Sequence, residues 1–240
     1  MPNIIGSKGI PIVIMIVAVH QPQYLPWLGY FDKIDRADVF VLLDNVQYKK
    51  NEWQNRNRIR TAQGWQWISV PVLNQFTQQI KDVRINSRVR WKKKHFHALL
   101  YNYAKSPYFK EHRPFFERTY NRNWQYLLDI NTHVIKYLVT TLGINTEIVI
   151  ASDLNVRNHP TERLIDICKT LGADTYLAGI GGYKYMDMER FKQAGIKVIF
   201  QDFKHRTYSQ LFEAFQPFMS VVDLLFNHGE ESLSIIKEMR

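Results

Sequence analysis

Short runs of apolar, β-branched residues alternate with amphipathic stretches over much of this chain. Residues 13–19 and 39–43 are predicted to be buried strands, with a short helix over residues 28–36 between them. The last third repeats the alternation, with strands expected at 147–150, 175–178 and 197–200 and helices at 161–171 and 183–193. Strands that alternate with helices predict an α/β fold with a mainly parallel sheet and helices on both faces.

The middle of the chain follows a different pattern. Residues 56–60 and 65–72 are predicted to be two strands joined by a hairpin turn. From Trp91 to Gly143 the pattern predicts two or three amphipathic helices, with Pro107 and Pro114 as boundaries and Gly143 as the final stop. We expect a helical insertion of about residues 88–143 inside a single α/β domain of residues 15–240. Residues 1–14 match no element and are expected to be a flexible leader or a mis-assigned start.

Composition narrows the class of protein. A content of 45% hydrophobic and 22% charged residues is typical of a globular protein. The longest apolar run, residues 10–19, is shorter than the roughly 20 residues that span a bilayer, so no membrane span is expected. The single cysteine, Cys168, falls in an apolar helical pattern and is expected to be buried. We therefore expect a cytoplasmic protein without disulfides.

The charge predicts an anionic partner. The net charge is +10, and much of the excess falls in residues 49–60 and 84–94. The basic run 88–94 contains Trp91 and is either a solvated helix start or a nucleic-acid patch. His95 and His97 lie two residues apart, so a helix would point them to different faces, and no metal site is expected.

The candidate chemistry lies at the predicted strand ends, where parallel sheets bind ligands. His20, Asp44, Gly179 and Gln201 each follow directly on a predicted strand. After the first strand, two prolines hold residues 20–27 in an extended loop. That loop presents the side chains of His20, Gln21, Gln23, Tyr24 and Trp27. In the alternative interpretation, His20 only caps the strand and Trp27 fills the core.

Residues 44–58 form a second candidate segment with few simple aliphatic side chains. Asp44 and the amides are expected to bind ligand hydroxyls, Trp53 an apolar ring face, and Lys50 and Arg56 a phosphate. The candidate residues of this segment are Asp44, Gln47, Lys50, Trp53, Asn55, Arg56 and Asn57. The alternative is a solvated turn followed by an edge strand.

A glycine-rich turn follows the strand at 175–178. Gly179, Gly181 and Gly182 are expected to allow close approach of a phosphate to backbone amides at the start of the next helix. Their spacing matches neither the Walker pattern nor G-x-G-x-x-G, and glycine also serves plain tight turns.

Several separated motifs together resemble the WbqC-like family of bacterial proteins, which are encoded among genes for O-antigen and other surface polysaccharides. The resemblance covers residues 15–229. It is carried by residues 20–34 (HQPQYLPWLGYFDKI), 37–41 (ADVFV), 44–47 (DNVQ), 53–57 (WQNRN), 172–177 (GADTYL), 201–203 (QDF), Tyr208, Gln210 and 223–227 (DLLFN). Ala178 departs from the serine expected before the glycine.

The resemblance implies an enzyme of surface-polysaccharide or glycolipid assembly, with group transfer to an amino sugar on a nucleotide or lipid carrier. In that hypothesis His20 is the general base, Asp44 orients it or the acceptor, and Gln201 belongs to the substrate site. The residues do not identify a cofactor. The alternatives are a non-catalytic RNA-binding protein, for which no recognised motif occurs, and a nucleotidylyltransferase-like enzyme, which is fold analogy alone.

Overall fold

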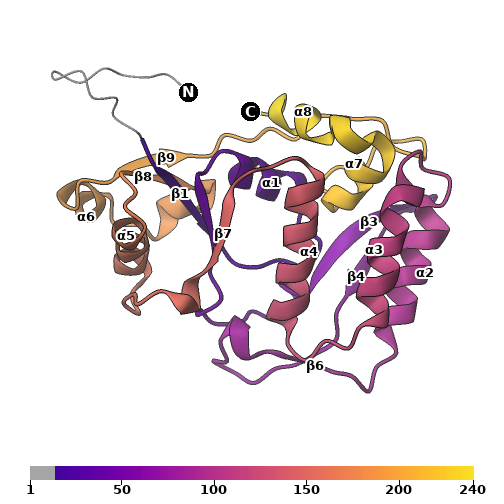
Figure 1. Ribbon diagram of the computed structural model, residues 1–240, viewed down its shortest axis with the longest axis horizontal. Coiled ribbons are helices and arrows are strands. Elements are labelled where there is room, and N and C mark those ends of the chain that lie inside the picture. Colours follow the sequence, from indigo (N-terminus) through magenta and orange to yellow (C-terminus); the bar gives the residue numbers. More distant parts are fainter. Residues whose placement is uncertain (1–13) are drawn as a thin grey trace.

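The centre of the fold is a five-stranded parallel sheet in the order β7-β2-β1-β8-β9 (Figure 1). The computed structural model describes residues 14–240. Val13, the expected start of the first strand, and most of the expected leader lie outside that range. The strands are β1 Ile16–His20, β2 Val39–Leu42, β7 Glu147–Ile150, β8 Thr175–Ala178 and β9 Lys197–Phe200.

The two faces of this sheet are buried under different helices. Val17 and Tyr176 point into a core shared with α5 and α6, whereas Ala18, Phe40 and Leu177 point into a larger core on the opposite face. That larger core contains α1, α4 and α7, and Figure 1 shows α5 and α6 on the other side of the strands. The helices are α1 Leu28–Asp35, α4 Leu127–Thr141, α5 Pro160–Thr170, α6 Met188–Gln193, α7 Val221–His228 and α8 Ser232–Lys237. The predicted parallel α/β sheet with helices on both faces is confirmed.

The strand order contains one point of reversal. From β1 the chain adds β2 and then β7 on one side, and afterwards adds β8 and then β9 on the other. The carboxyl ends of β1 and β8 therefore flank a crevice, since the connections leave these neighbouring strands toward opposite faces. In sheets of this kind the crevice is the usual ligand site.

Between β2 and β7 the chain forms two antiparallel pairs and then the helical insertion. The first pair is the hairpin β3 Arg56–Thr61 and β4 Gly64–Ser69, and the second is β5 Val72–Leu73 with β6 Arg84–Ile85. The helices α2 Trp91–Tyr103 and α3 Phe109–Asn121 pack against each other at the end of the molecule remote from α5 and α6 (Figure 1). The remaining elements are single turns, η1 Ile80–Asp82, η2 Ala151–Asp153, η3 Ile180–Lys184 and η4 Gly229–Glu231.

Three of the differences between predicted and observed element boundaries have a clear physical reason. Pro114 lies inside α3 rather than at its end, because buried side chains on both sides of it, Phe109 and Phe116, keep the helix packed. The strand expected at 65–72 divides before Pro71, which has no amide hydrogen for pairing. The helix expected at 183–193 begins only at Met188, because the side chain of Asp187 accepts hydrogen bonds from the first amides and caps it there.

No helix within residues 14–240 combines the length and the apolar character needed to cross a bilayer. Cys168 is fully buried in α5, and burial raises the pKa of its thiol to about 12. The thiol therefore stays protonated at neutral pH and serves as a small apolar side chain.

Candidate functional site

A cavity of about 250 Å³ lies at the reversal point of the sheet, between the carboxyl ends of β1 and β8. Its polar wall comes mainly from the end of β1 with its loop, one residue of α1 and the glycine turn after β8, and α5, β8 and the residue after β2 add apolar or aromatic side chains. The lining residues are Val19, His20, Gln21, Lys33, Leu43, Leu164, Tyr176, Gly179, Gly181, Gly182 and Tyr185. The crevice predicted from the strand ends is therefore a real cavity with polar groups in its wall.

His20 is the last residue of β1 and is half-buried at this cavity. Its Nε2 atom lies 3.2 Å from the amide nitrogen of Gln23, and its ring packs at 5.0 Å from the ring of Tyr30. Burial, and then the charge of Lys33, lower the pKa of His20 to about 3. The imidazole is consequently neutral at physiological pH, and Nε2, which accepts from the donor-only amide nitrogen of Gln23, is its unprotonated nitrogen.

Lys33 is a charged residue of this wall that was not among the predicted site residues. It lies on α1 with only 3% of its surface exposed, and its Nζ donates a 2.8 Å hydrogen bond to the carbonyl of Val19. Within residues 14–240 no carboxylate forms an ion pair with this ammonium group. Burial without a counter-charge lowers the pKa of Lys33 to about 7. The cavity thus contains an amine without a counter-charge, which is protonated in about half of the molecules at pH 7.

The glycine turn after β8 closes the other side. A Cβ atom on Gly179 would lie 3.9 Å from Nζ of Lys33, so the turn passes close to the ammonium group. The amide of Gly182 is already used, because it donates to the carbonyl of Gly179 at 2.8 Å. The turn is a single 3-10 segment, not the start of a long helix, so the helix-dipole part of the expected phosphate site is wrong. Close approach to Gly179 and Gly181 remains available, since a Cβ on Gly181 would meet nothing within 4 Å.

Asp44 lies at the end of the neighbouring strand, but its carboxylate is directed elsewhere. It is fully buried, and it accepts hydrogen bonds from the amide of Ser152 at 2.8 Å and from the hydroxyl of Ser152 at 2.6 Å. These bonds join the end of β2 to the turn after β7. Asp44 does not line the cavity, and its expected role in orienting His20 remains a prediction.

Other predicted substrate residues hold loops together. Asn55 and Asn57 are buried and donate to the carbonyls of Val70 and Leu25. The amide of Gln201 donates to the Gly29 carbonyl at 2.8 Å and to the Asp32 carboxylate at 2.6 Å. Tyr24 is fully buried, with its hydroxyl on His95 and Tyr120.

The remaining candidates lie outside the cavity wall. Trp27 is half-buried and packs edge-on against Phe203, with 5.4 Å between ring centroids. Gln47 and Lys50 are exposed on the loop after β2. Trp53 and Arg56 belong to an exposed face of the β3–β4 hairpin. One contact links this region to the cavity, because the Gln54 amide donates to the Gln21 side-chain oxygen at 2.6 Å.

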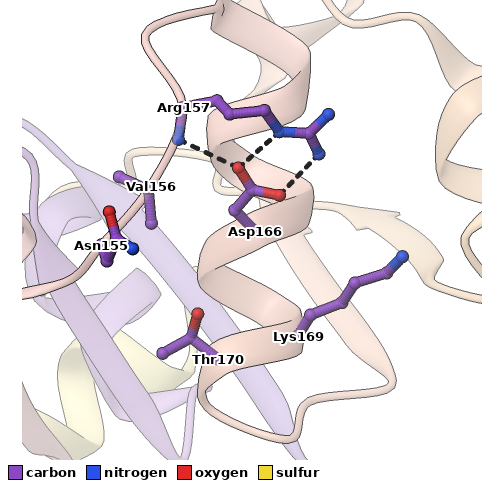
Figure 2. Close-up of a pocket in the computed structure, with 6 residues that line it drawn as sticks. All are labelled: Asn155, Val156, Arg157, Asp166, Lys169 and Thr170. Carbon is purple, nitrogen blue, oxygen red and sulfur yellow. Dashed lines mark hydrogen bonds and ion pairs between the residues drawn. The ribbon is translucent and has the colours of Figure 1, made fainter.

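A second hollow of about 390 Å³ lies beside α5 and is lined mainly by charged and polar side chains (Figure 2). There Arg157 binds Asp166 through its side chain, at 2.6 and 2.8 Å, and through its backbone amide. Glu162 also pairs with Arg157, at 2.7 Å. Arg157 and its two acidic partners thus satisfy one another, while Lys169 in the same wall forms no ion pair within residues 14–240. Within residues 14–240 no group of three or more histidine, cysteine, aspartate or glutamate residues is placed to hold a metal ion.

The sheet order and the cavity define a doubly wound α/β protein with a cavity at its reversal point. The model of the WbqC-like protein family matches residues 21–235, and the chain belongs to that family. It is also 36% identical over 228 residues to the uncharacterized protein Rv1507c of Mycobacterium tuberculosis, covering 93% of this chain and 98% of that protein. No solved structure gives a significant match.

Proposed function

We propose that this protein is a transferase of bacterial surface-polysaccharide or glycolipid assembly that acts on a phosphorylated amino sugar, carried by a nucleotide or a lipid. The observation that carries the proposal is the pairing of Lys33, a buried cation without a counter-ion, with the neutral His20 in one cavity. The pathway is what membership of the WbqC-like family suggests.

Lys33 is suited to bind the phosphate of the substrate. A buried ammonium group without a partner costs several kcal/mol, and an anion that enters the cavity removes much of that cost. The nearby Gly179 leaves room for a phosphate to approach the backbone, because it has no Cβ atom. Binding of an anion raises the pKa of Lys33 from about 7, so the lysine is fully protonated in the complex.

His20 is suited to accept a proton from the attacking amine or hydroxyl of the acceptor. The negative charge of the bound phosphate raises the pKa of His20 from about 3 toward the range useful for a general base. The imidazole is already neutral in the free protein, so no proton has to leave before the reaction. The side chain of Gln23, 3.2 Å from Nε2, fixes the orientation of the ring.

The test is a ligand screen by thermal shift with glucosamine 1-phosphate, nucleotide sugars, and acyl and aminoacyl donors. A ligand at a hundred times its Kd stabilises by about 2.7 kcal/mol, which is roughly 5–10 °C in a chain of this size. We expect Lys33→Met to abolish the shift given by glucosamine 1-phosphate. His20→Asn should keep that shift and lose the transfer product, measured by mass spectrometry.

The matched control is Lys110→Met, which removes an exposed lysine from α3. It should behave like the wild type in both assays. Equal binding of the amino-sugar phosphate by wild type and Lys33→Met would contradict the assignment of the site. Failure of every phosphorylated sugar to bind would contradict the proposed substrate class.

A further inference from the structure

One face of the β3–β4 hairpin carries only arginine, tryptophan and a serine. Residues directly opposite in an antiparallel pair project to the same side, and Arg58 is opposite Trp67, Arg60 opposite Trp65 and Arg56 opposite Ser69. The other side, with Asn57, Ile59 and Ile68, is buried in the core. Together with Trp53 from the preceding turn, the residues Arg56, Arg58, Trp65 and Trp67 are called here the arginine–tryptophan face.

The three tryptophans of this face remain accessible. Trp53, Trp65 and Trp67 are 36%, 41% and 39% exposed. The ring centroids of Trp53 and Trp67 lie 5.5 Å apart, and those of Trp65 and Trp67 lie 5.6 Å apart. Large aromatic rings gathered at the surface in this way are typical of binding sites, because they cover apolar ligand surface with little loss of side-chain freedom.

Two guanidinium groups lie against these rings. The centre of the Arg56 guanidinium is 4.3 Å from the Trp67 ring centroid, and that of Arg58 is 5.0 Å from Trp65. Stacking fixes the planes of both groups and leaves their edges to form hydrogen bonds. Each group has one protein acceptor, the carbonyl of Asn51 for Arg56 and that of Phe218 for Arg58.

Arg60, on the same strand, has a structural role and differs from Arg56 and Arg58. It is fully buried, and carbonyls of Thr61, Gly64 and the chain segment 212–214 surround its guanidinium. Arg56 and Arg58 have no such cage, and no carboxylate pairs with them within residues 14–240. Their Nε atoms are buried without a partner, as is that of Arg60, and one Nη atom of each binds a carbonyl. The other Nη atom of each has no partner within residues 14–240 and is not buried, so it fits an anion that comes from outside.

We propose that the arginine–tryptophan face is a binding site for a nucleoside diphosphate, with the base stacked on tryptophan and the phosphates on Arg56 and Arg58. A base provides the flat ring that tryptophan and arginine faces prefer, and the planar fork of arginine matches phosphate oxygens. The adjacent Lys49 and Lys50 are exposed and add to the positive charge, against one carboxylate at Glu52.

The size of the face favours one nucleotide over a nucleic-acid strand. Trp67 packs against both other rings, and Arg58 lies within 5.8 Å of all three, so the cluster offers room for one base rather than a row of platforms. Strand-binding proteins instead stack successive bases along a groove several nucleotides long.

This is a second ligand site, distinct from the cavity. It lies near the cavity because Trp53 precedes Gln54, which binds Gln21 in the cavity wall. Nucleotide binding at this face does not depend on the proposed transfer reaction in the cavity. The cavity test compares Lys33→Met with wild type on a sugar phosphate without a base, so either proposal can fail alone.

The experiment is a titration with uridine diphosphate, followed by quenching of tryptophan fluorescence. We expect saturable quenching, and an affinity at least tenfold lower in Trp67→Ala and in Arg58→Gln. Uridine alone and inorganic pyrophosphate alone should each bind at least tenfold more weakly than uridine diphosphate. The matched controls, Tyr101→Ala and Arg113→Gln, replace exposed residues of α2 and α3 and should stay within twofold of wild type.

Several results would overturn the site. They are absence of quenching at millimolar nucleotide, unchanged affinity in both Arg58→Gln and Arg56→Gln, and pyrophosphate binding as tight as that of the nucleotide. A ten-residue oligouridylate that binds more than a hundredfold tighter than the diphosphate at 150 mM salt would show a nucleic-acid site instead. A melting curve shows whether Trp67→Ala is folded. If it is not, the two arginine variants still test the site.

Discussion

Lys33 is the residue whose placement is hardest to explain by packing alone. Helix α1 is buried along nearly its whole length, and an apolar side chain of similar volume at position 33 would fill the same space without a desolvation cost. The neighbouring acid, Asp32, is no partner, because it binds Arg240 at 2.7 Å and Gln201 at 2.6 Å. A buried, unpaired lysine that faces a cavity is the pattern of a ligand-binding or catalytic group.

The pH dependence of stability tests whether Lys33 is as desolvated as its position indicates. Its pKa is about 7 in the folded protein against 10.5 ordinarily. Below pH 7 both states carry the proton, and the full cost of the buried charge is present. Above pH 7 only the unfolded state binds the proton, so the free energy of unfolding rises with pH until the ordinary pKa is reached. Between pH 7 and 9.5 this contribution is on the order of 3 kcal/mol.

The measurement is urea denaturation of wild type and Lys33→Met across that pH range. Other groups titrate there too, among them Cys168, but they are common to both proteins and cancel in the difference. We expect Lys33→Met to be the more stable protein at pH 7, with an advantage that shrinks as the pH rises. An advantage independent of pH would show that Lys33 keeps an ordinary pKa.

At the scale of single residues, the sequence predicted some of the residues that line the cavity and missed others. His20, Gln21 and the three glycines were predicted because they follow strands, and strand ends converge by geometry. Lys33 lies one helical turn after Tyr30, and the ring of Tyr30 packs on His20. This three-residue spacing was the available signal that Lys33 lies on the same side of the helix as His20. It was missed because a lysine in a short helix is ordinarily solvated, and sequence alone does not show that α1 is buried on all sides.

At the scale of elements, the strands of the sheet were predicted well because β-branched apolar runs have few other stable environments. β7, β8 and β9 have the expected bounds. Predicting which polar residues of 44–58 face a ligand was harder. Asn55 and Asn57 satisfy buried carbonyls, whereas Trp53 and Arg56 stay at the surface, and this division depends on the register of the β3–β4 hairpin.

The entry into α1 depends on one glycine. A Cβ atom on Gly29 would lie within 2.3–2.8 Å of three ring atoms of Trp27, and that ring is itself held against Phe203. Alanine usually stabilises a helix interior by about 1 kcal/mol over glycine. Here we expect the opposite sign for Gly29→Ala, a loss of about 1–3 kcal/mol from overpacking.

Chemical denaturation of Gly29→Ala checks this sign. Gly181→Ala is the matched comparison, because an added Cβ there meets nothing within 4 Å, and its stability should change by less than about 0.5 kcal/mol. A stabilised Gly29→Ala protein would mean that Trp27 moves freely, and would weaken the view that the 20–27 loop is held rigidly at the cavity.

At the scale of the whole molecule, the sequence predicted the order of elements but not their arrangement in space. Side chains alternate between the two faces of each strand, so a core on each face of the sheet could be predicted. The reversal between β1 and β8 could not, because it depends on the pairing of strands that are far apart in the sequence. That reversal decides which strand ends share a cavity. It places β8 beside β1, so the glycine turn reaches His20, while Asp44 at the end of β2 is bound to the turn after β7.

The net charge of +10 is also a property of the whole molecule, and it gives the last prediction. A positive surface field attracts RNA without selecting a sequence. That attraction weakens as the salt concentration rises, because counterions released into a more concentrated solution gain less entropy. The salt slope is near −0.7 per neutralised phosphate on a single strand, so about six contacts would lose two to three decades of affinity between roughly 50 and 200 mM salt. We expect RNA binding at low salt to be weak, indifferent to sequence and absent at 150 mM.

A small phosphorylated ligand should behave differently, because only one or two phosphates are neutralised and its affinity changes modestly over the same range. The measurement is a pair of titrations, one with oligouridylate and one with uridine diphosphate, each at 50 and 150 mM salt. Sequence-selective, sub-micromolar RNA binding that persists at 150 mM would favour an RNA-binding protein over a transferase.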